Sequence, residues 1–247
     1  MQIKLLQWNI LYKEKIENTV KLLKDINPDI FCLQELGINC NYNPTVKSIP
    51  EYIANQLGVN YHYSFYSKAD KSEMVAIANG VFSKFPILHK DSFFTQKPGK
   101  NPKSFSDEGK TYAEVDIKIN ESMLTVATAH LSYTHKFIVT DKKKAEVDNL
   151  LNHIKNKKEK YIFTGDLNST PDSYIVSELS RYFVHAGPSY KEPTWTTKLF
   201  DYQGFREDKL RWRLDYVFTS KEIRIISSEI IKTNFSDHLP ILVTCNI

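Results

Sequence analysis

Strand-like and helix-like patterns alternate along this chain, and the alternation limits its fold more than any other feature of the sequence. The apolar runs IKLLQWNI (3–10) and DIFCLQE (29–35) are typical of buried strands, and residues 14–26 between them repeat apolar side chains at helical spacing. A similar apolar stripe predicts a helix over 141–155. Further strands are predicted for TYAEVDIKI, SMLTVATAHLS, YIFTGDLN, RLDYVFTS and ILVTCNI. This order favours an α/β fold with two packed sheets and helices on their outer faces.

Local signals set several element boundaries. Asn27-Pro28 ends the first helix, because the residue before a proline avoids the α region. Residues 50–58 predict a short helix that Gly58 closes, since glycine suits the left-handed C-cap position. Asn120-Glu121 separates two alternating segments and predicts a hairpin. One or two strands are predicted around Asn79-Gly80.

The composition is that of one ordinary globular domain. The chain has 247 residues, 41% of them hydrophobic and 25% charged, which excludes a disordered protein and fits a single domain over 1–247. The net charge of +4 permits a polyanionic substrate without demanding one, because the excess is spread along the chain. The densest basic run, Lys142-Lys143-Lys144, falls in the predicted helix and favours a solvated helix face.

Cysteine usage and hydropathy bear on the compartment. The three cysteines, Cys32, Cys40 and Cys245, form no CxxC pair, and Cys32 lies in an apolar run as a buried free thiol would. The first residues show no signal-peptide pattern, and no apolar run reaches membrane-spanning length. We therefore expect a cytoplasmic protein without membrane insertion.

Two stretches predict long surface loops, at 94–110 and at 185–212. The second carries two of the three tryptophans, and long loops in a compact domain are often functional. Neither shows a clear exposed apolar hairpin of the kind that would favour a lipid substrate.

Polar residues interrupt or end the apolar strands in a consistent way. Each one alone has a structural explanation: Asn9 suits a turn, and Asp166 could cap the segment STPDSY, where Pro171 suits a first helical turn. Together they are harder to explain without a shared site, because every one is a carboxylate, carboxamide or imidazole. The set comprises Asn9, Glu35, His130, Asp166, Asn168, Asp215, Asp237 and His238. Mg²⁺ binds such oxygen ligands, and phosphoryl transfer needs a base for water and donors for the phosphate oxygens.

Six motifs in order, QWNI, LQE, AHLS, TGDLNSTPDS, RLDYVF and SDHLPI, resemble those of the endonuclease/exonuclease/phosphatase superfamily. This group includes DNase I, the exonuclease III-like repair enzymes, the tyrosyl-DNA phosphodiesterases, the sphingomyelinases and the inositol polyphosphate 5-phosphatases. The match runs from Asn9 to His238. The resemblance implies a four-layer αββα sandwich of the DNase I type, with the site at one rim of two packed mixed sheets.

The resemblance also implies roles. Glu35 would be the principal ligand of Mg²⁺, with Mn²⁺ as a possible substitute, and Asn9 and Asp237 would lie near the cation. Asp166 would orient or deprotonate the attacking water. The phosphate would contact Asn168 and two histidines, His130 and His238, and Asp215 would hold the other nitrogen of His238. Glu73 is a possible partner of His130.

The substrate is less constrained than the chemistry. PTWTT and RWRLDYVF resemble the tyrosyl-DNA phosphodiesterase branch, so Trp195 and Arg213 could bind substrate, although Thr196 stands where an acidic residue would make the match closer. Equally, Trp195 could cover a sheet end and Arg213 pair with a carboxylate. We expect a monomeric phosphodiesterase acting on nucleic acid. A phosphatase or phosphodiesterase for lipid or inositol-phosphate head groups is the alternative, and a non-catalytic binding module is a remote one.

Overall fold

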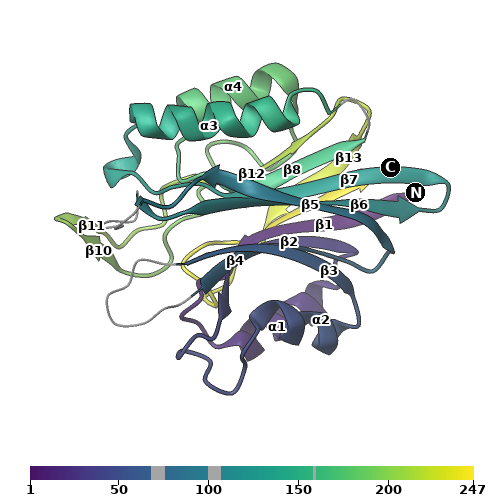
Figure 1. Cartoon of the computed structure of the whole chain (residues 1–247), viewed down its shortest axis with the longest axis horizontal. Helices are drawn as coiled ribbons and strands as arrows, with labels where there is room; N and C mark the ends of the chain where they lie inside the picture. Colours follow the sequence, from purple (N-terminus) through teal and green to yellow (C-terminus); the bar gives the residue numbers. More distant parts are fainter. Residues whose placement is uncertain (68–75, 100–106, 158–159) are drawn as a thin grey trace.

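The computed structural model describes residues 1–67, 76–99, 107–157 and 160–247, and it shows two packed β-sheets between two layers of helices (Figure 1). The first sheet has the strand order β13 (Arg224–Ile230), β14 (Ile241–Asn246), β1 (Gln2–Asn9), β2 (Ile30–Ile38), β4 (Ala76–Ser83), β3 (Asn60–Ser67). The second has the order β5 (Ile87–Gln96), β6 (Lys110–Ile119), β7 (Ser122–His130), β8 (Tyr161–Asp166), β12 (Asp215–Thr219), β9 (Val184–His185). The predicted α/β sandwich of four layers is confirmed.

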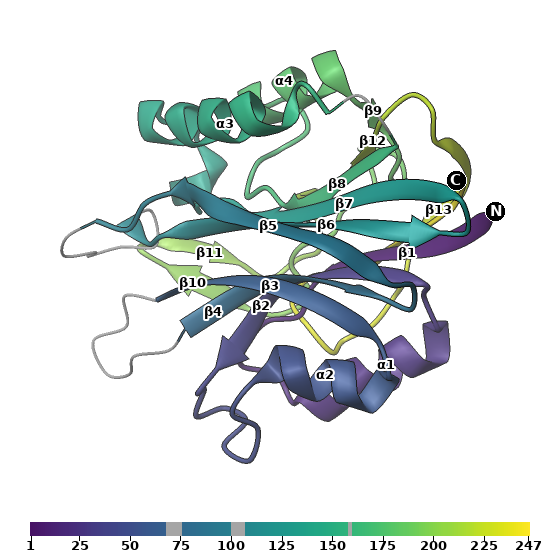
Figure 2. The same cartoon turned by 45° about the vertical axis from the view of Figure 1, so that its right-hand side comes forward.

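The helices cover the two outer faces in pairs. Figure 2 shows α1 (Ile16–Ile26) and α2 (Ile49–Leu57) on the first sheet, and α3 (Asp141–Ile154) and α4 (Tyr174–Tyr182) on the second. Both sheets are mixed, as predicted: β1 pairs in parallel with β2, and β7 with β8, whereas β1–β14 and β8–β12 are antiparallel. None of the helices in the described part of the chain has the length and apolar character needed to cross a bilayer.

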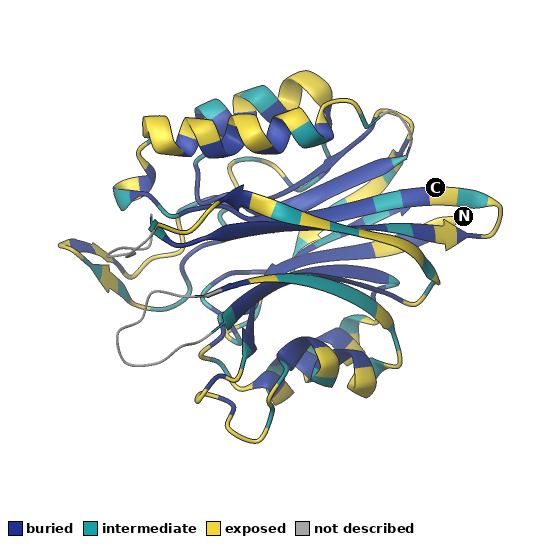
Figure 3. Ribbon diagram, viewed as in Figure 1, coloured by how far each residue is buried: buried dark blue, intermediate teal, exposed yellow. Residues whose placement is uncertain are grey.

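Three apolar layers hold the sandwich together, and Figure 3 shows burial concentrated on the strands and on the inner helix faces. Between the sheets, Leu5 and Val81 of one pack with Val126 and Val217 of the other. A second layer joins α3 and α4 to the second sheet, and a third joins α1 and α2 to the first sheet. Because both sheets are covered on both faces, their central strands are apolar on both sides, as the sequence indicated.

The predicted boundaries are confirmed where a local signal was strong. Asn27 adopts a left-handed φ of 52° and its backbone N–H donates to the Leu23 carbonyl at 2.8 Å, which ends α1. Gly58, with φ 63°, ends α2 in the same way. The hairpin of β6 and β7 turns at Asn120-Glu121. Asn79-Gly80 makes no turn and lies inside the single strand β4.

The two long loops are shorter than predicted. β5 extends to Gln96 and β6 begins at Lys110, and residues 100–106 of the intervening segment lie outside the described residues. The second loop contains a hairpin that was not predicted, formed by β10 (Phe200–Tyr202) and β11 (Phe205–Glu207). Phe200 packs on Trp195 and Phe205 on Trp212, and none of the exposed positions, Asp201, Gln203, Gly204 and Arg206, is a large apolar residue, so it is not an exposed apolar hairpin.

Candidate active site

Sheet topology brings the predicted polar residues to one edge of the sandwich. Asn9, His130 and Asp166 are the last residues of β1, β7 and β8, and Glu35 lies in the second half of β2. Parallel neighbours end at the same edge of a sheet. β12 and β14 run antiparallel to β8 and β1, so their starts, at Asp215 and just after His238, lie at this edge too.

A buried ion pair lies at the centre of the site. His238 Nδ1 is 2.8 Å from Asp215 Oδ2, both side chains are almost fully buried, and Asp215 Oδ1 accepts a hydrogen bond from Gln7 Nε2 at 3.1 Å. Burial opposes the charge on His238, but the carboxylates of Asp215, Asp166 and Asp237 outweigh it and raise the pKa of His238 well above its usual value. These carboxylates therefore favour the imidazolium form of His238.

Asp166 lies between the two histidines of the site. Its Oδ2 is 3.4 Å from His130 Nε2 and 3.5 Å from His238 Nε2, and it accepts a hydrogen bond from Asn9 Nδ2 at 3.0 Å. Burial raises the pKa of Asp166 to about 7, with His238 acting in the opposite direction and Asp215 adding to the rise. A carboxyl with a pKa near 7 suits proton transfer at neutral pH.

Asn168 follows Asp166 in an unusual backbone conformation that aims its amide at the site. Its φ is 46°, its backbone N–H donates to Asp166 Oδ1 at 2.9 Å, and its Nδ2 donates to the Leu131 carbonyl at 3.0 Å. The same Nδ2 lies 3.0 Å from His130 Nε2. Positive φ values in non-glycine residues cost energy and cluster at functional sites. Glu35 is a second example, with φ 59° at the irregular register of β2 and β4.

Glu35 is the residue best placed to bind a cation. Its Oε1 accepts from Asn9 Nδ2 at 3.2 Å, but its Oε2 is buried without a hydrogen-bond partner among the described residues. A buried carboxylate oxygen without a donor is costly, and a hard divalent cation would satisfy it. The donor set of Glu35 and Asp237, two carboxylates at one cavity, fits Mg²⁺ or Mn²⁺. Asn9 is buried, and its amide nitrogen, not its oxygen, faces Glu35 and Asp166, so in this geometry it orients both carboxylates.

Trp195 lines the cavity and also holds Asp237. The residue is 3% exposed, and its Nε1 donates to Asp237 Oδ2 at 3.0 Å. Asp237 Oδ1 accepts from Ser236 Oγ at 3.3 Å. The indole thus fixes one candidate cation ligand, a role the sequence did not indicate.

Arg213 is not brought to the cavity, so its position does not support substrate binding. Its side chain is buried and does not line the cavity; Nε donates to the Asp215 carbonyl at 2.7 Å, and Nη1 donates to the Ser189 and Glu192 carbonyls at 3.2 and 3.0 Å. The alternative pairing with a carboxylate is not seen either, because these acceptors are backbone carbonyls. Glu73 lies outside the described residues.

A cavity of about 310 Å³ opens at these residues. One wall is aromatic and comes from Tyr133, Phe137, Trp195 and Phe200, and three lysines also line it. The lysines are Lys13, Lys110 and Lys198. The sequence predicted Trp195 as a substrate-binding candidate, and Trp195 lines the cavity, whereas Tyr133, Phe137, Phe200 and the lysines were not predicted. The concentration of aromatic residues after His130 and in the second long loop was the available signal.

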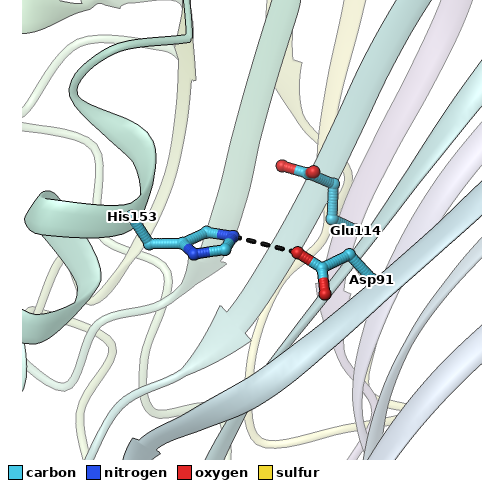
Figure 4. Close-up of side chains that lie close together, drawn as sticks. All are labelled: Asp91, Glu114 and His153. Carbon is cyan, nitrogen blue, oxygen red and sulfur yellow. Dashed lines mark ion pairs between the residues drawn. The ribbon is translucent and has the colours of Figure 1, made fainter.

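Among the described residues, two groups of three ionisable side chains have metal-like spacing, one within this site and one outside it, and in both the histidine is paired with a carboxylate. In the first, the ring nitrogens of His238 bridge Asp215 and Asp166 as ion pairs. In the second, on the outer side of the second sheet, His153 Nε2 lies 3.1 Å from Asp91 Oδ2 beside Glu114 (Figure 4). Lys157 Nζ lies 2.6 Å from Glu114 Oε1 and already supplies the positive charge, so this is an ion-pair cluster.

Comparison with known proteins agrees with this geometry. A model of the endonuclease/exonuclease/phosphatase family matches residues 6–238. No curated protein sequence matches the chain. An endonuclease/exonuclease/phosphatase structure from Beutenbergia cavernae is similar with a TM-score of 0.79 at 15% identity, covering 100% of this chain and 72% of the other.

Two further similar structures have more specific names. D. rerio TDP2 in complex with a single-strand DNA product has a TM-score of 0.70 at 16% identity, covering 100% of this chain and 99% of the other. A mannosyl-6-phosphatase from Bacteroides thetaiotaomicron has a TM-score of 0.65 at 15% identity, covering 99% and 100%. At these identities the likeness shows a shared fold.

Proposed function

Since the chain belongs to the endonuclease/exonuclease/phosphatase family, whose members hydrolyse phosphoester bonds with a divalent metal ion, we propose that it is a phosphodiesterase acting on nucleic acid. Water would attack the phosphorus in line with the leaving oxygen, and no covalent enzyme intermediate would form.

One observation carries the proposal: Asp166 lies between two imidazoles and lines the cavity. A carboxylate flanked in this way can accept a proton from water while the neighbouring imidazoles face the phosphate oxygens. The pKa of about 7 leaves a substantial fraction of Asp166 ionised at neutral pH.

The remaining residues have complementary roles in this proposal. His238, kept charged by Asp215, stabilises the negative charge that develops on the phosphate oxygens, and His130 and Asn168 assist it. Glu35 and Asp237 would hold the cation, which when bound polarises a phosphate oxygen and stabilises the leaving oxygen. Asn9 and Trp195 orient these carboxylates by their N–H groups.

The walls of the cavity favour nucleic acid as the substrate. Aromatic faces stack on bases of any sequence, and Tyr133, Phe137 and Phe200 lie beside the catalytic carboxylate in one cavity. Lys13 and Lys198 line the same cavity and can contact neighbouring phosphates. D. rerio TDP2, whose structure contains a single-strand DNA product, shows that this fold accommodates DNA.

The size of the cavity favours one alternative. About 310 Å³ is enough for a single sugar-phosphate or inositol-phosphate head group, so a phosphatase or phosphodiesterase for small or lipid head groups is the second candidate.

A substrate panel separates the two candidates. Purified protein is assayed with Mg²⁺, Mn²⁺ or EDTA on single- and double-stranded DNA, a 5′-phosphotyrosyl oligonucleotide, RNA, sphingomyelin, an inositol polyphosphate and a sugar phosphate. Asp166→Asn serves as the matched inactive control, because it keeps the shape of the side chain. Metal-dependent cleavage of a nucleic acid that is lost in Asp166→Asn supports the proposal. Turnover of only the head-group substrates replaces it with the second candidate, and no turnover of any substrate contradicts both.

A further inference from the structure

Two charged residues of α3 are completely buried next to the active site without lining it. The side chains of Lys143 and Glu146 are 1% and 0% exposed, and Lys143 Nζ lies 3.6 Å from Glu146 Oε2. Lysine and glutamate are almost never fully buried unless they are paired, and a buried pair is a weak source of stability. Their neighbours Lys142 and Lys144 have side chains 47% and 49% exposed, so the predicted solvated face holds for these two and is wrong for Lys143.

Glu146 binds the segment that follows β7. Both its carboxylate oxygens accept from the Ser132 backbone N–H at 3.1 Å, and Oε2 also accepts from Ser132 Oγ at 2.6 Å. Thr95 Oγ1 of β5 donates to Oε1 at 3.2 Å. Ser132 is two residues after His130, so Glu146 fixes the backbone immediately beyond this histidine.

Lys143 binds the same segment and the one that follows β8. Its ammonium donates to the Ser132 carbonyl and, at 3.0 Å, to the Leu167 carbonyl. Leu167 stands between Asp166 and Asn168. One ammonium therefore joins the two backbone segments that present His130, Asp166 and Asn168 to the cavity.

These segments need such support because sheet pairing stops where they begin. The register of β7 and β8 ends at His130 and Asp166. Beyond it, the Leu131 N–H donates to the Asp166 carbonyl at 2.9 Å, and Asn168 adopts a left-handed backbone. The Ser132 and Leu167 carbonyls point under α3, where a buried carbonyl without a donor would be costly.

We propose that Lys143 and Glu146 are positioning residues that fix the spacing between His130 and the Asp166–Asn168 segment, and so set the rate of the chemical step. This inference rests on the proposed phosphoesterase function. Lys143 and Glu146 act through the backbone and do not touch substrate. Displacement of a catalytic group by about 1 Å can lower the rate on the order of 100-fold.

The test compares four variants with a matched control. Lys143→Met and Glu146→Gln each remove one charge, and Lys143→Met combined with Glu146→Gln removes both charges so that no unpaired ion is left buried. Lys143→Arg keeps the charge and the donors. Glu114→Gln is the control, because Glu114 is also buried, holds Lys157 and Tyr112, and does not line the cavity.

Turnover on the best substrate is measured at a temperature where circular dichroism shows each variant to be folded. We expect the double variant to lose kcat by about 10- to 100-fold with KM changed less than about 2-fold, Lys143→Arg to recover most of the rate, and Glu114→Gln to keep the wild-type kcat. Unchanged kcat in the folded double variant, or an equal loss in Glu114→Gln, would overturn the proposal.

Hydrogen exchange of the Leu131–Ser132 and Leu167–Asn168 amides gives a readout that does not depend on activity. We expect faster exchange at both segments in the double variant and not in Glu114→Gln. Wild-type protein that hydrolyses no phosphoester would refute the proposed function alone, whereas unchanged exchange at both segments would refute the positioning role whatever the activity.

Discussion

Trp195→Phe should lower the affinity for the metal ion while the protein stays folded. The substitution removes the Nε1–H that donates to Asp237 Oδ2 at 3.0 Å, and it keeps an aromatic ring between Phe137 and Phe200, whose centroids lie 5.5 and 5.1 Å away. A hydrogen bond to a charged group contributes about 1.5–3 kcal/mol. If this energy serves to orient Asp237 for the cation, its loss corresponds to a drop in metal affinity of about 10- to 100-fold, the usual effect of removing a partner of a metal ligand.

Isothermal titration calorimetry with Mn²⁺ and Mg²⁺ measures the effect directly, and the metal concentration that gives half-maximal turnover is a second measurement. The matched control is Trp212→Phe. That indole donates from Nε1 to Glu207 Oε2 at 2.8 Å, also packs on Phe137, and does not line the cavity. Both variants should lower the free energy of unfolding in urea to a similar extent, and only Trp195→Phe should change metal affinity. A metal affinity in Trp195→Phe within 2-fold of wild type, or an equal loss in Trp212→Phe, would refute the assignment.

Three further predictions concern other parts of the molecule. Gly165→Ala should destabilise the protein by about 1–3 kcal/mol or more in urea unfolding, because the new Cβ would lie 2.1 Å from the Ala129 carbonyl oxygen; a loss below about 0.5 kcal/mol would contradict the close approach of β7 and β8. Glu35→Gln should keep the unfolding midpoint of metal-free protein and abolish the rise in stability that Mg²⁺ gives the wild type, which thermal unfolding with and without Mg²⁺ tests. Burial, and to a smaller extent the charge of Arg213, lowers the pKa of His185 from 6.5 to about 4. Between pH 4 and pH 6.5 the unfolded chain therefore binds more protons at this residue than the folded protein does. Stability should therefore fall by up to about 3 kcal/mol as the pH drops from 6.5 to 4. His185→Asn should remove this loss, and an identical pH profile of unfolding in the variant would count against it.

The sequence could indicate which polar residues stand at strand ends, because its signals are local and the topology is regular. Asn9, His130 and Asp166 each end an apolar strand, and the parallel pairs β1–β2 and β7–β8 bring such ends together. An apolar pattern that predicts where a strand ends thus also predicts that the last side chain of the strand lies at this edge of the sandwich. Asp215 and His238 come from strand starts, and antiparallel pairing returns them to the same edge.

Apart from Trp195, the aromatic wall of the cavity was not predicted, and the part that includes Phe200 depends on how a long loop folds on itself. Residues 185–212 have no periodicity, and the hairpin of β10 and β11 follows from the turn at Gln203-Gly204, where both residues have positive φ. That hairpin places Phe200 in the cavity wall. Arg213 was predicted as a substrate-binding candidate because it stands next to a motif residue. In the structure it donates to three backbone carbonyls instead.

Lys143 shows where pattern reasoning fails for a physical reason. A run of three lysines in a helix predicts solvation, yet consecutive helical positions are rotated by about 100°, so the three side chains point in different directions. Lys143 stands four residues before the buried Val147 and so shares its face, whereas Lys142 and Lys144 are rotated away. An apolar residue there would leave the Ser132 and Leu167 carbonyls without their donor. A donor at this position thus serves two loops that are distant in sequence from each other. The apolar spacing of the helix places residue 143 on the buried face, but it does not indicate that a donor is needed there.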